Sequence, residues 1–290
     1  MHVAPECFPC LLRQTINTAR SAGAQEAQLL AMLREITAYI AQADLSQTPA
    51  RFSEPAYAMV ARLTGVADPY AAMKKETNAM ALRLLPKLRN RMTQNLDPLT
   101  LALQMAAAGN VIDAGIDHHA DIQKLLNQLL QLSFTINDVP LFRKLLKRGT
   151  RLLYLADNAG EIVFDVLAVE RIQRLGANVT VAVKSGPIIN DATLEDARTA
   201  GLPKICKVIE TGAASIGLDM QRVTPEFRAA YQSADVVIGK GHGHLETLFR
   251  DPHPGLFFLL KVKCPVVAKS LLCTMGDLVF RHASRLQAVA

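Results

Sequence analysis

The stretch LLYLADNAGEIVFD, residues 152–165, decides the fold. Its first five residues form a short apolar run that is typical of a buried central strand, and the run stops on Asp157 and Asn158. Apolar residues then recur at helical spacing as far as Gly176, and a β-branched run follows at 178–183. The order strand, loop, helix, strand predicts an α/β protein with a parallel sheet covered by helices.

The loop after the first strand is a candidate site for a metal and a phosphate. Ligands of parallel sheets bind at the carboxyl ends of the strands, where Asp157 and Asn158 fall. A carboxylate beside an amide offers hard oxygen ligands for Mg²⁺ or a similar ion. Gly160 allows close backbone approach, and the free N–H groups that open the next helix favour an anion. Helix capping by Asp157 or Asn158 explains the same spacing equally well.

A second polar loop, residues 184–197, follows the next predicted strand. In a parallel sheet its carboxylates lie beside the first loop, so Asp191 could complete a metal site begun by Asp157 and Asn158. The acidic helical turn that follows also allows a capping role for Asn190 or Asp191.

A third loop, KGHGH at residues 240–244, follows a buried strand predicted at 235–239. Glycines, a lysine and two histidines at the end of a strand suit phosphate or metal. The glycines favour substrate binding by Lys240, Gly241, His242 and His244 over zinc binding by the histidine pair, and a plain loop remains an alternative.

Composition indicates an ordinary soluble globular protein. Of its 290 residues, 50% are hydrophobic and 20% charged, which is enough for a large core. The net charge of +6 suits an anionic substrate but is too diffuse to indicate nucleic acid. Residues 1–10 lack the order of a signal peptide, and no apolar run reaches the length of a membrane span. Five cysteines argue against a secreted disulfide framework, so we expect a cytoplasmic protein.

Cys7 and Cys10 form a C-x-x-C pair that opens a predicted helix. Two thiolates at this spacing can share one metal, but a closed zinc site needs two further ligands, to which Cys264 or Cys273 could contribute only if the fold brings them close. Buried unreactive thiols and a redox role are the alternatives.

The first half of the chain shows helical periodicity, and the second half alternates strands with helices. We place the boundary at 148/149, with a helical amino-terminal subdomain at 1–148 and an α/β metal- and phosphate-binding domain at 149–290. Asn110 is expected to cap a helix, and Asp113 could face the site. A further short strand is predicted at 207–210, and the apolar segment 256–260 leads into a terminal strand predicted at 266–268.

The order of several motifs resembles the damage-control phosphatase family, a group of metal-dependent phosphatases with an ARMT-like domain, in its prokaryotic branch. The likeness covers nearly the whole chain. The motifs that carry it are CFPC at 7–10, DPY at 68–70, GNVID at 109–113, DNAGE at 157–161, PIINDA at 187–192 and KG at 240–241.

The resemblance implies a Rossmann-like, mainly parallel sheet with helices on both faces, plus a helical amino-terminal subdomain. It implies hydrolysis of small phosphorylated metabolites, such as sugar phosphates, with Mg²⁺, Mn²⁺, Co²⁺ or Ni²⁺. Carried over by motif, Asp157, Asn158 and Asp191 are the expected metal ligands and catalytic residues. Glu161, Lys240 and Lys263 are the expected substrate or phosphate contacts.

His242 and His244 depart from the resembled pattern, because related chains commonly have Gln and Asn there. The change keeps hydrogen-bonding capacity but affects the choice of substrate or metal. Two other functions are considered: a non-catalytic module that binds a phospho-ligand or nucleotide, and an S-adenosylmethionine-dependent carboxyl methyltransferase. Neither a Gly-x-Gly-x-x-Gly fingerprint after the first strand nor a P-loop pattern is present. The substrate, the native metal and the oligomeric state stay open.

Overall fold

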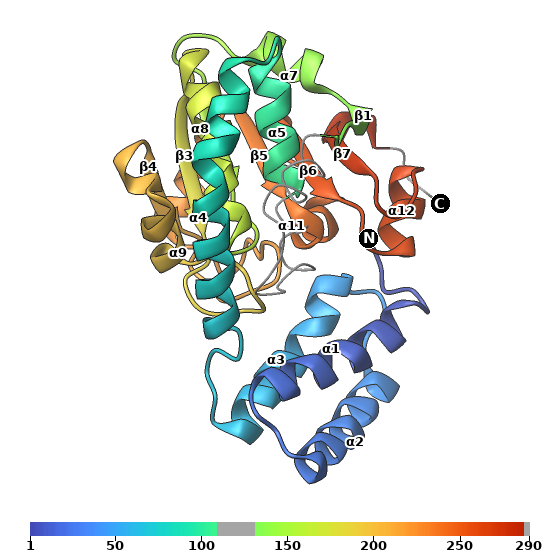
Figure 1. Cartoon of the computed structure of the whole chain (residues 1–290). Coiled ribbons are helices and arrows are strands. Elements are labelled where there is room, and N and C mark those ends of the chain that lie inside the picture. The colour runs from blue at the N-terminus through green and yellow to red at the C-terminus, as the bar shows by residue number, and fades with distance from the viewer. Residues whose placement is uncertain (109–130, 287–290) are drawn as a thin grey trace.

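A computed structural model describes residues 1–108 and 131–286, and its main feature is one seven-stranded sheet (Figure 1). The strands are β1 (Phe134–Asn137), β2 (Arg151–Leu155), β3 (Asn178–Val183), β4 (Lys207–Glu210), β5 (Val236–Lys240), β6 (Leu256–Lys261) and β7 (Leu278–His282). Their order across the sheet is β1-β7-β6-β5-β2-β3-β4, and every pair is parallel except β6 with β7. The expected α/β class with a mainly parallel sheet is therefore confirmed.

Helices cover both faces of this sheet and form a separate group at the amino terminus. Those in the described ranges are α1 (Cys7–Ser21), α2 (Glu26–Gln42), α3 (Pro49–Thr64), α4 (Ala71–Thr93), α5 (Pro98–Ala108), α7 (Val139–Leu145), α8 (Glu161–Arg174), α9 (Leu194–Ala200), α10 (Pro225–Ser233), α11 (Gly241–Leu248) and α12 (Pro265–Leu271). Helices α1–α3 lie together beyond one end of the sheet, and α4 runs from them along α8 (Figure 1).

Alternation along β2 explains how one strand serves two cores. Leu152 and Tyr154 belong to the core shared with α4, α5 and α8, whereas Leu153 and Leu155 belong to the core shared with α10, α11 and α12. Successive side chains of a strand point to opposite faces, so a continuous apolar run is what a strand buried on both sides requires.

The amino-terminal helices divide between two cores. Helices α1, α2 and α3 enclose a core of their own around Leu11, Met32 and Phe52, which are each at most 1% exposed. Helices α4 and α5 instead pack against α8 and join the core on one face of the sheet. The partition at 148/149 stays a prediction.

Near the carboxyl terminus the structure differs from the prediction. The segment 266–268, predicted as a strand, belongs to helix α12. The Cys264 Sγ accepts a hydrogen bond from the Val267 N–H, and Pro265 occupies the first turn, where a proline leaves no helical bond unmade. The last strand is β7, antiparallel to β6, and the sequence analysis did not predict it.

Two further predictions concern the ends of elements. Residues 241–244, predicted as a loop, are the first turn of helix α11. Asn110 and Asp113 lie outside the described residues. None of the helices in the described ranges is long and apolar enough to cross a membrane.

We expect Phe142→Ala to lower the free energy of unfolding by about 3–5 kcal/mol, because the fully buried ring leaves a cavity. The ring makes edge contacts with Phe257 and Phe280, each with centroids 5.2 Å apart. Denaturant titration measures the change. Leu96→Ala, at an exposed leucine, is the matched control and should leave stability unchanged. An equal effect of both substitutions would contradict this description of the core.

Candidate functional site

The site is built where β2 and β3 end side by side. The two strands pair in parallel as far as Leu155 and Ala182. Beyond them the two loops stay joined, because the Ala192 N–H donates to the Asp157 carbonyl at 2.7 Å and the Ala159 N–H donates to the Asn190 carbonyl at 2.9 Å. The arrangement brings the Asp157 and Asn158 loop beside the Asp191 loop, as the parallel sheet predicts.

A cavity of about 690 Å³ opens at these loops, a size typical of small-molecule sites. Its lining comes from the loops that follow β2 and β3 and from the start of α11, and it also includes residues of α1 and α3. The predicted site residues that line it are Asp157, Asn158, Glu161, Asp191, Gly241, His242 and Lys263. Lys240 and His244 are not in its wall, and both are at most 1% exposed.

The two carboxylates of the loops carry strongly perturbed acidities. Burial raises the pKa of Asp157 well above its usual value, and the neighbouring Asp191 carboxylate adds to the rise. Burial also raises the pKa of Asp191, to about 6, although the Lys184 ammonium opposes the rise. Buried carboxylates that face each other are costly to ionise, and a cation between them removes that cost.

Lys184 is a buried partner of the site that the sequence analysis did not single out. It is 1% exposed, its Nζ donates to the Gly217 carbonyl, and it lies 3.6 Å from an Asp191 carboxylate oxygen. A buried ammonium requires such partners. Lys184 directly follows the strand predicted at 178–183, and this position at the carboxyl end of a strand could have indicated that it belongs to the site.

Lys240 lies behind the cavity wall in a buried polar cluster. Its Nζ is 2.5 Å from a Glu161 oxygen and donates to Asp165 Oδ1 at 2.7 Å, where the Tyr154 hydroxyl also donates. Burial alone would lower the pKa of Lys240, but the carboxylates of Asp165 and Glu161 outweigh it and the pKa is raised. In this arrangement Lys240 holds Glu161, which itself faces the cavity.

The two predicted histidines make different contacts. His242 Nε2 accepts a hydrogen bond from the Lys263 backbone N–H at 3.0 Å, which ties helix α11 to the segment that carries Lys263. His244 Nδ1 donates to the Lys240 carbonyl at 2.7 Å, and its Nε2 is buried without a partner in the described part of the chain. Burial lowers the pKa of His242 to about 4 and that of His244 to about 3, so both rings are neutral at pH 7.

Gly241 is required for the approach of helix α11 to the first loop. Its φ is +73°, and a Cβ at this position would lie 1.9 Å from Asp157 Oδ2. Any side chain would therefore displace the carboxylate as well as strain the backbone.

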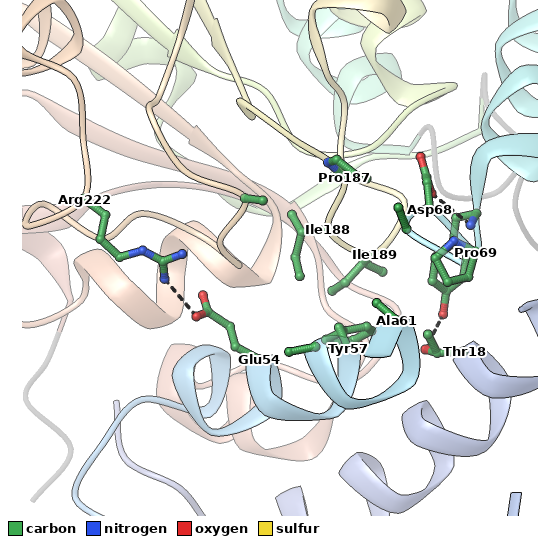
Figure 2. A pocket seen from close by; sticks show the side chains of 14 residues that line it. Thr18, Glu54, Tyr57, Ala61, Asp68, Pro69, Pro187, Ile188, Ile189 and Arg222 are labelled. Carbon is green, nitrogen blue, oxygen red and sulfur yellow. Dashed lines mark hydrogen bonds and ion pairs between the residues drawn. The ribbon is translucent and has the colours of Figure 1, made fainter. Parts of the chain in front are cut away.

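The second loop carries backbone strain two residues before Asp191. Ile189 has φ +48°, a left-handed conformation that is costly for a β-branched residue and is found mainly at functional sites. Figure 2 shows Ile188 and Ile189 above the helix that carries Tyr57, at a second cavity of about 240 Å³. Ile189 lines both cavities and so forms part of the wall between them.

The cysteine pair lies in the wall of the main cavity. Cys7, Cys10 and Cys264 all line it, Cys273 does not, and all five cysteines are free thiols. Burial raises the pKa of the Cys7 and Cys10 thiols. Within residues 1–108 and 131–286, no three His, Cys, Asp or Glu side chains are grouped to hold a metal. A metal held by the Asp157 and Asp191 carboxylates therefore also needs amide, water or substrate oxygens.

Comparisons with known proteins agree along nearly the whole chain. The family model "Damage-control phosphatase ARMT1-like domain" matches residues 3–279. The chain is 33% identical to "Damage-control phosphatase PH1575" of Pyrococcus horikoshii over 96% of this chain and 97% of that protein. It is 32% identical to "Damage-control phosphatase" of Archaeoglobus fulgidus over 96% and 98%. The crystal structure of a DUF89 family protein from Pyrococcus horikoshii superposes with a TM-score of 0.90, at 33% identity, over 98% of this chain and 99% of that one.

We expect His244→Asn to reduce the acid sensitivity of folding. Because the pKa of His244 is about 3 in the folded chain and about 6.5 when unfolded, the unfolded state takes up a proton as pH falls through 6.5 and the folded state does not. Wild type should lose about 2 kcal/mol more stability than the variant between pH 7 and pH 5. Denaturant titrations at the two pH values measure the difference, with His2→Asn, at an exposed histidine, as control. Parallel losses in wild type and His244→Asn would contradict the assignment.

Proposed function

Since the chain belongs to the damage-control phosphatase ARMT1-like domain family, we propose that it is a cytoplasmic, divalent-metal-dependent phosphatase of small phosphorylated metabolites. The relatives from Pyrococcus horikoshii and Archaeoglobus fulgidus are named damage-control phosphatases. The observation that carries the proposal is the pairing of the Asp157 and Asp191 loops in the wall of one cavity.

The donor set at these loops suits a hard divalent cation. Asp157, Asn158 and Asp191 offer two carboxylates and an amide oxygen, the ligand types that Mg²⁺ and Mn²⁺ prefer. Charge supports the same choice. Around the loops four carboxylates, Asp157, Glu161, Asp165 and Asp191, face the two buried ammonium groups of Lys184 and Lys240. Carboxylates outnumber ammonium groups in this set, and a divalent ion would favour the charged forms of the acids whose pKa burial raises.

We assign the metal to Asp157, Asn158 and Asp191. These residues would hold Mg²⁺, Mn²⁺, Co²⁺ or Ni²⁺, and a bound ion of this kind would supply Lewis-acid chemistry at the phosphate ester. The residues of the chain then have separate tasks. Asp191 is held by Lys184, and Asp157 is held by its backbone bond to Ala192 and by close packing against Gly241.

We assign phosphate binding to Lys263. This residue is exposed and lines the cavity, so its ammonium can balance the charge of a phosphate dianion. Glu161, fixed from behind by Lys240, presents its carboxylate to the cavity and can accept a hydrogen bond from a substrate hydroxyl. A cation for the phosphate and an acceptor for hydroxyls together suit a small polyhydroxylated phosphate ester, such as a sugar phosphate.

A metal-swapped screen tests the proposed reaction. We expect the chelated protein to release no phosphate from a panel of sugar phosphates, and Mg²⁺, Mn²⁺, Co²⁺ or Ni²⁺ to restore release. Phosphate is measured colorimetrically. A binding module would retain the esters without hydrolysis, and a methyltransferase would bind S-adenosylmethionine saturably without added metal. Either of those results in place of phosphate release would contradict the proposal.

Asp157→Ala should lower metal-dependent turnover by about 10² to 10³-fold, since it removes a charged group at the centre of the site. Steady-state phosphate release from the best substrate of the panel measures the effect. Asp235→Asn is the matched control, because Asp235 pairs with Arg151 at the start of β2, at the end of the strand opposite to the site. Full turnover by Asp157→Ala would refute the assignment.

A further inference from the structure

Asn78 of helix α4 bridges the two loops of the site with one side-chain amide. It is 3% exposed. Its Oδ1 accepts a hydrogen bond from the Gly160 N–H at 2.6 Å, and its Nδ2 donates to Asp196 Oδ1 at 2.8 Å. The orientation of the amide is fixed by its partners, because a backbone N–H can only donate and a carboxylate can only accept.

On the side of the first loop, α4 presses directly against Gly160. This glycine has φ +75°, and a Cβ there would lie 2.9 Å from the Thr77 Cβ. Gly160 ends the loop that carries Asp157 and Asn158 and immediately precedes α8. The Asn78 bond therefore fixes the point at which the loop turns into the helix.

On the side of the second loop, the bond from Asn78 reaches the cap of α9. The other oxygen of Asp196, Oδ2, accepts from both the N–H and the hydroxyl of Thr193 at 2.8 Å. Thr193 follows Asp191 by two residues and forms a β-bridge with Lys184. Lys74, one turn before Asn78 on α4, lies 3.5 Å from Asp196 Oδ2 and balances its charge.

We infer that Asn78 is a positioning residue that sets the Asp157 loop and the Asp191 loop at the spacing the metal requires. The inference rests on the proposed function for the identity of the ligand. The position needs one acceptor toward Gly160 and one donor toward Asp196, which an amide provides in one side chain. An aspartate would place two carboxylates against each other in a buried site.

Exchanging the amide of position 78 and the carboxylate of position 196 provides a compensating double variant. Asn78→Asp keeps the acceptor for Gly160 but loses the donor to Asp196. In the double variant Asn78→Asp with Asp196→Asn, the new amide at 196 can donate to position 78 while its oxygen still accepts from Thr193. The number of charges is the same as in wild type. Arg89→Ala is the control, because Arg89 also lies on α4 and joins it to α8 through an exposed ion pair with Glu170, away from both loops.

The first measurement is amide hydrogen exchange of the metal-free protein in peptides covering 157–161 and 191–196. We expect Asn78→Asp to speed exchange in both segments by about tenfold or more, the double variant to restore protection, and Arg89→Ala to match wild type. Unchanged exchange in Asn78→Asp would overturn the bridge. A double variant no better protected than the single one would also overturn it.

The second measurement is the Kd for Mn²⁺ by calorimetry on the same proteins. We expect a weakening of about 10–100-fold in Asn78→Asp and recovery in the double variant, the range typical of residues that support metal ligands. Loosened loops with an unchanged Kd would overturn the positioning role. If wild type itself binds no Mn²⁺, the proposed function fails, while the exchange experiment still decides whether Asn78 joins the loops.

Discussion

The 2.7 Å hydrogen bond from the Ala192 N–H to the Asp157 carbonyl continues the pairing of β2 and β3 past the ends of the strands. Together with the bond from the Ala159 N–H to the Asn190 carbonyl, it keeps the two loops joined where they leave the sheet. The bond is a backbone bond, so it constrains the main chain directly after the Cα atom of each acidic residue. Every other part of the site, from the close packing of Gly241 to the amide of Asn78, acts on loops that are already joined.

The buried charge around these loops is the second constraint. Lys184 and Lys240 are each at most 1% exposed. Lys184 is held by the Asp191 carboxylate and the Gly217 carbonyl, and Lys240 by the carboxylates of Glu161 and Asp165. Removing one partner of such a set leaves the other charge unpaired, which is far more costly than the pair is favourable. Asp157 has no such buried ammonium partner in the described part of the chain, and burial raises its pKa well above the usual value.

The sequence predicted the central parallel strands and that the loops would meet, because both follow from local periodicity and from the geometry of parallel strands, but it did not predict the outer strands β1 and β7. It did not predict Lys184 or Asn78 as parts of the site, since their roles depend on partners 33 and 82 residues away. The strand predicted at 266–268 was wrong, because a three-residue apolar run is compatible with a strand or a helix. The N-cap at Cys264 favours the helix that the structure shows.

The separate core of α1, α2 and α3 has a consequence for how the protein can diversify. The cavity wall facing the acidic loops includes Arg13, Gln14 and Ser53, which belong to a unit that packs around Phe52 rather than around the sheet. Substitutions that reshape this wall leave the interior beneath the acidic loops untouched. The wall contributed by α1 and α3 and the acidic loops therefore belong to separately packed cores, so the shape of the wall can change in evolution without repacking the core beneath the loops.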